Sequence, residues 1–319
     1  MYKKSLLSFP VLFWMMLITA SAPAIAQSSA DNADIPITVS LDIPRSVEFC
    51  GKKISLERYD MRERFDREQL AFMYMHSTSL QLIKRANLFF PIIEPILKAN
   101  GIPDDFKYLA AVESALDPRA LSPAKAAGIW QFMDATGRRY GLEINSEVDE
   151  RYHVEKATVA ACKYLKEAYD KYGDWATVAA SYNAGMQKIS SEQDKQAVSS
   201  SFDMLLVDET SRYVFRILAA KRFLENPQSF GFLLKKAHLY HYIRTDKVKV
   251  TGPVADWADW AKQQGITYGQ LKDFNIWLRD RSLTNKAGKT YVISIPQKED
   301  LNFDIRKVKV HNKNWVIDQ

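Results

Sequence analysis

The sequence predicts a mainly α-helical protein with a small α+β unit near its C-terminal end. From Met61 to about Pro227, apolar residues recur at intervals of three and four, which is the period of helices with one buried face. After about Gly231 the pattern changes to short alternating segments that are typical of strands. Of the 319 residues, 47% are hydrophobic and 26% are charged, as in a folded globular chain rather than a disordered one.

The first 26 residues predict a secretory signal peptide. Lys3 and Lys4 precede the apolar run VLFWMMLI (11–18), and the small-residue site Ala24-Ile25-Ala26 follows it. The alternative is a membrane anchor, but this run is short for a membrane span. No later segment is apolar enough to span a bilayer, so we expect an exported chain with no membrane-spanning segment after cleavage. Residues 27–60 are expected to form a polar arm or linker.

Residues that start or end helices divide the helical region. The expected segments are 65–98, 103–117, 122–133 with a further helix that ends at 141, 154–172, 174–185 and 208–226. Ser122 with Pro123 is a favourable start for the third segment. Gly173 is a favourable end for the fourth, and Asp174 caps the fifth. The Ser-rich stretch 190–201 is expected to be a loop.

The C-terminal unit has a β-α-α-β order. Val248–Val250 and Tyr291–Pro296 alternate like strands, and two short helical segments, DWADWAKQQGI and YGQLKDFN, lie between them. The expected organisation of the chain is a signal peptide (1–26), an arm (27–60), a helical domain (61–230, core about 104–223), a C-terminal unit (231–300) and an exposed basic tail (301–319).

One carboxylate lies where the helical pattern requires an apolar residue. Glu113 falls in the middle of the apolar face of its helix, and no residue three or four positions away is basic. Burial raises the pKa of a carboxyl group and keeps it protonated near neutral pH. A neutral carboxylic acid can protonate the leaving oxygen of a glycosidic bond. The alternative is a core glutamate that is paired across helices with Arg119 or Arg139.

Further polar side chains lie among apolar ones. Gln131, Asn183, Tyr182 and Tyr213 are neutral groups that can hydrogen-bond sugar hydroxyls and N-acetyl groups without adding a charge that would ionise a nearby carboxyl group. The alternative is that Gln131 and Asn183 cap helix ends and that both tyrosines are ordinary core aromatics. Trp130 is expected either in the core or on the floor of a cleft.

Four blocks in the helical region carry a resemblance to a known family. They are E-S-x-L at 113–116, S-P-x-x-A-x-G-x-W-Q at 122–131, S-Y-N-A-G at 181–185 and E-T-x-x-Y at 209–213. In order and spacing they resemble the soluble lytic transglycosylase domain, the goose-type-lysozyme-like family of peptidoglycan-cleaving enzymes. Trp130 and the D-E-R-Y block at 149–152 resemble the murein lytic transglycosylase D subgroup. Lys125 and Ser181 depart from the usual Gly and Ala, and the lipid-bearing cysteine of the subgroup is missing.

The resemblance implies a lysozyme-like helical fold and a role for each matching residue. Glu113 would be the single acid/base that cleaves the bond between N-acetylmuramic acid and N-acetylglucosamine and leaves a 1,6-anhydromuramyl end. Glu209 would orient the helix of Tyr213 or cap its first turn. Peptidoglycan glycan strands would be the substrate, with no cofactor, and the periplasm would be the location. The residues implied to line the cleft and bind substrate are Ser122, Gln131, Tyr182, Asn183 and Tyr213.

The segment from about Asp246 to Pro296 resembles a degenerate LysM module. Its usual G-D-T start is replaced, with Gly252-Pro253 at that point. LysM modules bind glycans that contain N-acetylglucosamine, so the resemblance implies a tether to the substrate. The alternative is a unit that packs on the helical domain and has lost sugar binding.

Charge and cysteine content narrow the function classes. The net charge is +6, and loss of the signal peptide with Lys3 and Lys4 lowers it to +4. This balance suits an anionic polymer or surface, and no pattern predicts nucleic-acid binding. Of the two cysteines, Cys162 is expected to be a buried thiol, although a disulfide with Cys50 is allowed. No Cys/His cluster has metal-ligand spacing.

Three rival functions remain open from the sequence. A hydrolytic muramidase on the same fold would need a second carboxylate to activate water, and the acids near the motifs are Asp117, Asp134 and Asp149. A non-catalytic peptidoglycan-binding protein would be expected to have lost Glu113. A structural or adaptor protein would bind no sugar.

Overall fold

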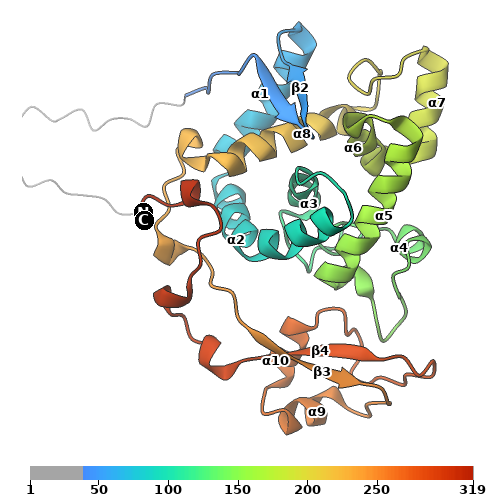
Figure 1. Cartoon of the computed structure of the whole chain (residues 1–319), viewed down its shortest axis with the longest axis vertical. Helices are drawn as coiled ribbons and strands as arrows, with labels where there is room; N and C mark the ends of the chain where they lie inside the picture. The colour runs from blue at the N-terminus through green and yellow to red at the C-terminus, as the bar shows by residue number, and fades with distance from the viewer. Residues whose placement is uncertain (1–38, 319) are drawn as a thin grey trace, which may run out of the picture. The chain divides into compact units, whose positions relative to one another are not determined.

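The computed structural model describes residues 39–318 (Figure 1). The predicted signal peptide and the first part of the predicted arm lie outside the described residues. The helices are α1 Tyr59–Tyr74, α2 His76–Ala99, α3 Phe106–Ser114, α4 Asp134–Arg139, α5 Val154–Tyr172, α6 Trp175–Ala184, α7 Met186–Gln196, α8 Asp208–Glu225, α9 Trp257–Gln263 and α10 Tyr268–Phe274. The strands are β1 Ser46–Phe49, β2 Lys52–Ser55, β3 Thr245–Val250 and β4 Tyr291–Pro296. The mainly α class with a small α+β C-terminal unit is confirmed.

Helix α3 lies in the centre of the helical region. In Figure 1 it is surrounded by α2, α5, α6 and α8, and it packs directly against α2 and α8. Phe106, Leu109 and Ala110 are buried completely, as their spacing predicts. The helix ends earlier than the predicted stop at Pro118, because Ala115 and Leu116 adopt left-handed backbone angles with φ of 50° and 55°. Left-handed angles cost non-glycine residues about 1 kcal/mol each, so packing imposes this turn directly after Glu113 and Ser114.

Strong end signals place the following helices correctly. Helix α5 ends at Gly173, which has a φ of 62°. The Asp174 carboxylate accepts a hydrogen bond from the Thr177 N–H at 3.0 Å and caps α6. Helix α7 is a helix where a Ser-rich loop is predicted. Its sequence lacks a regular apolar face, because Met186 and Ile189 are its apolar residues and the rest are polar.

The segment after Ser122 is a loop rather than the predicted helix. Residues 120–132, called here the 120–132 loop, are held by isolated bridges that pair Ala127 with Leu121 and with Phe132. Gly128 has a φ of 77°, and a Cβ at this position would lie 1.9 Å from the Arg151 carbonyl oxygen. This close approach and the left-handed angle explain the glycine. They also show that tertiary packing overrides the local helix-start signal.

Both ends of the described chain pack against the helices. The β1–β2 hairpin falls within the predicted arm, yet Phe49, Ile54 and Leu56 are buried in the main apolar cluster. The predicted exposed tail differs in the same way, since Trp315 is 1% exposed and its Nε1 donates to the Leu224 carbonyl at 2.5 Å. Cys50 and Cys162 are free thiols, and Cys162 is buried.

The C-terminal unit has the predicted β-α-α-β order. Strands β3 and β4 pair antiparallel, with Val248 opposite Ile293, and α9 and α10 pack with them. Its apolar cluster also contains Ala127, Val148 and Tyr152 from the helical region. The two parts therefore share a hydrophobic core.

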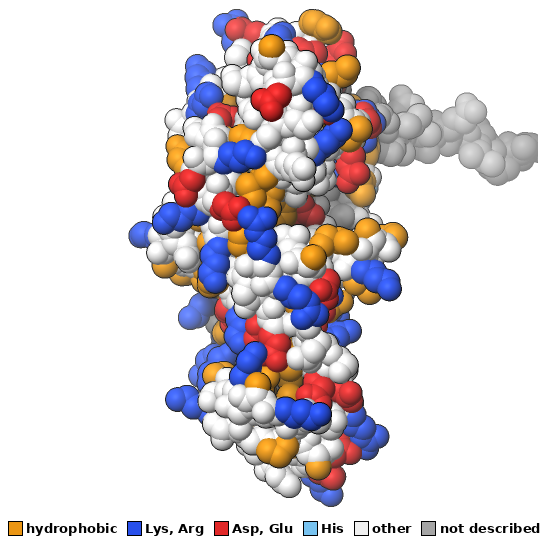
Figure 2. All heavy atoms as spheres, turned by 90° about the vertical axis from the view of Figure 1, so that its right-hand side faces the viewer, with side chains coloured by type: hydrophobic (Ala, Val, Ile, Leu, Met, Phe, Trp, Pro, Cys, Tyr) orange, Lys and Arg blue, Asp and Glu red, His pale blue; other side chains and the backbone are white. Residues whose placement is uncertain are grey.

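The surface carries mixed charges. On the face drawn in Figure 2, Lys and Arg side chains alternate with Asp and Glu, and no large area of one sign is visible. Over residues 39–318, no helix has both the length and the apolar character that crossing a membrane requires.

Candidate active site

Glu113 lies at the C-terminal end of α3 and faces α8. The Tyr213 hydroxyl of α8 donates a hydrogen bond to Glu113 Oε1. The residue as a whole is half-buried, while its carboxyl group is withdrawn from water. Burial raises its pKa to about 7; the Tyr213 hydrogen bond opposes this rise, the charge of Glu209 adds to it, and that of Arg216 opposes it.

The predicted structural alternative for Glu113 does not hold. Arg119 pairs with Asp273 in the C-terminal unit at 2.9 Å. Arg139 forms its ion pair with Glu167 of α5. Neither arginine pairs with Glu113, whose hydrogen-bond donor is the neutral hydroxyl of Tyr213.

The structure brings both predicted tyrosines to this carboxyl group. Tyr213 is 2% exposed, and Tyr182 is half-buried with its hydroxyl donating to the Trp130 carbonyl at 2.8 Å. Burial, and then the charge of Glu113, raise the pKa of each tyrosine well above its ordinary value. Both hydroxyls therefore stay protonated, that of Tyr213 as the donor to Glu113 and that of Tyr182 as a donor to the Trp130 carbonyl. Trp130 is fully buried and its Nε1 donates to Thr158 Oγ1 at 2.8 Å, so it belongs to the core.

Ser122 and Gln131 both lie in the 120–132 loop, where their polar atoms hold the loop itself. Ser122 Oγ accepts from the Ala126 N–H at 3.0 Å. Gln131 Nε2 donates to the Gly128 carbonyl at 2.8 Å and to the Ala120 carbonyl at 3.3 Å. Gln131 therefore does not cap a helix end, since its amide nitrogen binds two carbonyls within the loop.

Asn183 joins the end of α6 to the start of α8. Its Oδ1 accepts from Thr210 Oγ1 at 2.8 Å, and its Nδ2 donates to Glu209 Oε1 at 3.4 Å. Glu209 lies in the first turn of α8, where the resemblance places it; it is exposed, and its charge also acts on Glu113. No sequence pattern indicated that electrostatic effect.

Two residues that the sequence left without a role connect the parts of the site. Ser114 Oγ donates to the Ile129 carbonyl at 2.9 Å and so ties α3 to the 120–132 loop. Arg151 donates to the carbonyls of Lys125 and Phe132 in the same loop. Their signals in the sequence are the position of Ser114 directly after Glu113 and that of Arg151 inside the D-E-R-Y block.

The other acids near the motifs have basic partners of their own. Asp117 pairs with Arg85 at 3.0 Å, and Asp134 pairs with Arg138 at 2.6 Å. Asp149 pairs with Arg151 at 2.7 Å. Over residues 39–318, no group of three or more His, Cys, Asp or Glu side chains is arranged to hold a metal ion.

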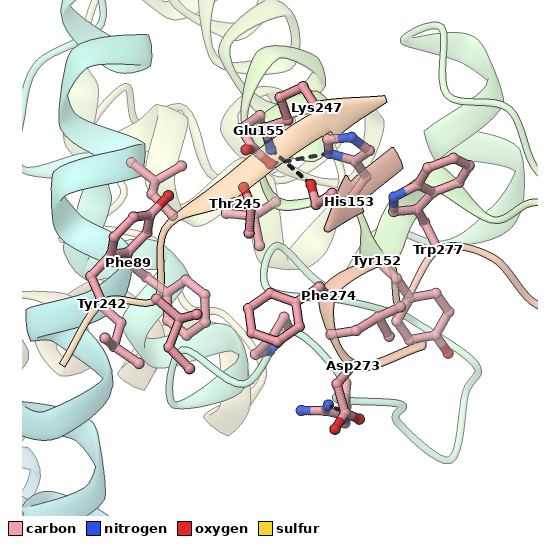
Figure 3. A pocket seen from close by; sticks show the side chains of 18 of the residues that line it. Phe89, Tyr152, His153, Glu155, Tyr242, Thr245, Lys247, Asp273, Phe274 and Trp277 are labelled. Atoms are coloured by element: carbon pink, nitrogen blue, oxygen red, sulfur yellow. Dashed lines mark hydrogen bonds and ion pairs between the residues drawn. The ribbon is translucent and has the colours of Figure 1, made fainter. Parts of the chain in front are cut away.

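A separate cavity of about 320 Å³ lies between the helical region and the C-terminal unit (Figure 3). His153 Nδ1 lies 3.1 Å from Glu155 Oε2, and the His153 ring stacks on Trp277. Phe89 and Tyr242 form another part of its wall. This cavity contains none of the site residues predicted from the sequence.

Comparisons with known proteins match both parts of the chain. The family model described as "Transglycosylase SLT domain" matches residues 90–204. The one described as "Soluble lytic transglycosylase C-terminal LysM-like domain" matches residues 246–299. The chain is 32% identical over 230 residues to "Membrane-bound lytic murein transglycosylase D" of Escherichia coli K12, which covers 70% of this chain and 49% of that protein. The chain thus spans about half the length of this relative.

Two solved structures are also similar, each at 20% sequence identity. The 70 kDa soluble lytic transglycosylase of Escherichia coli aligns with 51% of this chain and 30% of its own, at a TM-score of 0.38. An inactive variant of the lytic transglycosylase Slt from Pseudomonas aeruginosa aligns with 41% of this chain and 22% of its own, at a TM-score of 0.33. The resemblance read from the sequence is confirmed by the family models and the curated relative. The chain carries a transglycosylase SLT domain and a LysM-like domain of the soluble lytic transglycosylase type, and it is homologous to lytic murein transglycosylase D.

Proposed function

We propose that the chain is a periplasmic peptidoglycan lytic transglycosylase and that Glu113 is its single catalytic acid/base. The observation that carries the proposal is a carboxyl group inside the SLT match whose pKa is raised to about 7 and whose hydrogen-bond donor is neutral. Such a group is protonated in a large fraction of molecules at neutral pH, yet it can release its proton during a reaction cycle.

The proposed reaction needs one carboxyl group in two states. Protonated Glu113 gives its proton to the oxygen that links N-acetylmuramic acid to N-acetylglucosamine, and the bond from that oxygen to the muramyl C1 breaks. The Glu113 carboxylate then takes the proton of the muramyl C6 hydroxyl, whose oxygen bonds to C1. The products are a free N-acetylglucosamine 4-hydroxyl and a 1,6-anhydromuramyl end, and no water is consumed.

The surroundings of Glu113 suit both steps. The Tyr213 hydroxyl stabilises the carboxylate once the first proton has left. Tyr182 and Asn183 offer neutral donors and acceptors near α3 and the start of α8. Hydrolysis on the same fold would require a second carboxylate that activates water. Asp117, Asp134 and Asp149 are paired with arginines, which argues against each of these three as that second carboxylate.

The test is mass spectrometry of purified peptidoglycan after digestion by the protein, by Glu113→Gln and by Glu63→Gln, an exposed glutamate on α1. We expect 1,6-anhydromuramyl products from the wild type and from Glu63→Gln, and none from Glu113→Gln. Reducing-end products would overturn the proposal in favour of a hydrolase. Sedimentation with the glycan but no product from any of the three proteins would indicate a non-catalytic wall-binding protein.

A further inference from the structure

The chain contains the same local arrangement of aspartate and arginine twice. Asp149 and Arg151 form it in η1 (Glu150–Tyr152), and Asp304 and Arg306 form it in η5 (Ile305–Lys307). In both, the aspartate carboxylate accepts a hydrogen bond from the backbone N–H of the arginine two residues later, at 3.1 Å and 2.9 Å. In both, the arginine Nη2 also donates to the carboxylate, at 2.7 Å and 2.8 Å.

The two arginines differ in what surrounds them. The side chain of Arg151 is 9% exposed, whereas that of Arg306 is 87% exposed. The other terminal nitrogen of Arg151, Nη1, donates to the Lys125 carbonyl at 2.9 Å and to the Phe132 carbonyl at 3.1 Å. The planar guanidinium group can hold a carboxylate on one edge and two carbonyls on another.

Those carbonyls belong to the 120–132 loop, which contacts residues around Glu113. Within the loop, the Ile129 carbonyl accepts from Ser114, and the Trp130 carbonyl accepts from Tyr182. The backbone of Gly128 lies directly against the Arg151 carbonyl. A shift of this loop would therefore disturb the hydrogen bonds of Ser114, the residue directly after Glu113, and of Tyr182.

On its other side, the η1 segment is attached to the C-terminal unit. The Asp149 N–H donates to the Trp277 carbonyl at 2.9 Å, and Val148 bridges to Leu278. The Arg279 guanidinium lies over the Tyr152 ring at 4.4 Å from its centroid. The contacts thus run from the C-terminal unit through Asp149 and Arg151 into the 120–132 loop.

We propose that Arg151 is a positioning residue for the reaction at Glu113 and that it transmits the placement of the C-terminal unit to the 120–132 loop. This inference rests on the proposed function for its kinetic consequences. Its structural content, the coupling of Arg151 to the loop, is measurable without any activity. A lysine in place of Arg151 keeps the positive charge but cannot make all of these hydrogen bonds at once.

The experiment compares Arg151→Lys with Arg306→Lys, the matched arginine on the surface, in the full chain. Amide hydrogen exchange is read peptide by peptide, and turnover of peptidoglycan is followed against pH. For Arg151→Lys we expect exchange in residues 120–132 to accelerate about 10-fold or more, with α3 and α6 unchanged. We expect kcat to fall about 10- to 100-fold, with little change in KM and none in the pH midpoint, because the groups next to Glu113 remain. Arg306→Lys should match the wild type in every measurement.

Wild-type exchange rates in the loop of Arg151→Lys would overturn the inference. So would equal acceleration over the whole helical region, since that pattern indicates general destabilisation. Asp149→Asn provides a second variant, which removes the charged partner of Arg151 and keeps the donors to the loop; we expect acceleration in the same loop. Absence of anhydromuramyl products from the wild type would contradict the proposed function alone, and the exchange data would still decide the coupling.

Discussion

Two carboxylates lie against different sides of helix α8 and are treated in opposite ways. Glu68 of α1 is 1% exposed and accepts from Arg212 at 2.5 Å and from Arg216 at 3.1 Å. Glu113 of α3 accepts from Tyr213, the residue next to Arg212 in the sequence. One helix therefore neutralises a buried carboxylate with two guanidinium groups and offers the other a neutral hydroxyl. The difference shows that burial alone does not set the state of a carboxyl group: Glu68 has paired cations, whereas Glu113 lacks one, as its proposed role as an acid/base requires.

The largest expected contrast is in stability. Glu68→Gln should lower the free energy of unfolding by about 2–3 kcal/mol, because two partly buried guanidinium groups lose their charged acceptor. At pH 8, Glu113→Gln should leave the free energy of unfolding unchanged or raise it. The same variant should lower activity about 10³-fold or more. Urea denaturation of both variants measures the first effect. A Glu113→Gln protein that is less stable than Glu68→Gln would break the comparison.

The raised pKa of Glu113 also predicts how stability depends on pH. Its folded-state pKa of about 7 lies above the ordinary value of 4.5, so the folded state binds more protons between these values. Glu113 therefore contributes up to about 3 kcal/mol to the free energy of unfolding below about pH 4.5, and this contribution is lost as the pH rises through 7. Glu113→Gln should gain stability relative to the wild type between pH 5 and pH 8. Parallel curves for the two proteins would contradict the raised pKa.

Removal of the Tyr213 hydroxyl should increase the difference between Glu113 and the ion-paired Glu68. Tyr213→Phe deletes the hydrogen bond that favours the carboxylate, so the pKa of Glu113 should rise above about 7. Since the acid must be protonated, the alkaline limb of the pH–rate profile should move upward by about half a unit to one unit. Tyr172→Phe is the control, because its hydroxyl contacts Met186 and Ser190 instead. A downward movement of the limb in Tyr213→Phe would contradict this assignment.

The smallest effect should come from Glu209. Its negative charge raises the pKa of Glu113, so Glu209→Gln should move the same limb downward, by about a few tenths of a unit. The neighbouring Asp208 is exposed and pairs with Arg67 and Arg212, which makes Asp208→Asn the matched control. Equal shifts in the two variants would indicate a general change of surface charge and not a specific effect of Glu209.

The sequence predicted what depends on local signals. Helices α5 and α6 have regular apolar faces with Gly173 and Asp174 at their ends, and Glu113 was found because it breaks such a face. The 120–132 loop was predicted as a helix because the reason for Gly128, a carbonyl 23 residues later in the chain, is tertiary. Likewise, nothing local could reveal that Arg151 holds this loop.

The shared cluster of Ala127, Val148 and Tyr152 has a consequence for how this kind of chain can be rearranged. A C-terminal unit that only tethered substrate could be exchanged for another module by recombination at the linker. Here an exchange would expose three apolar side chains of the helical region and remove the carbonyl that anchors Asp149. The two regions that the family models match are therefore not independent modules. A newly grafted module would require complementary changes at these three positions.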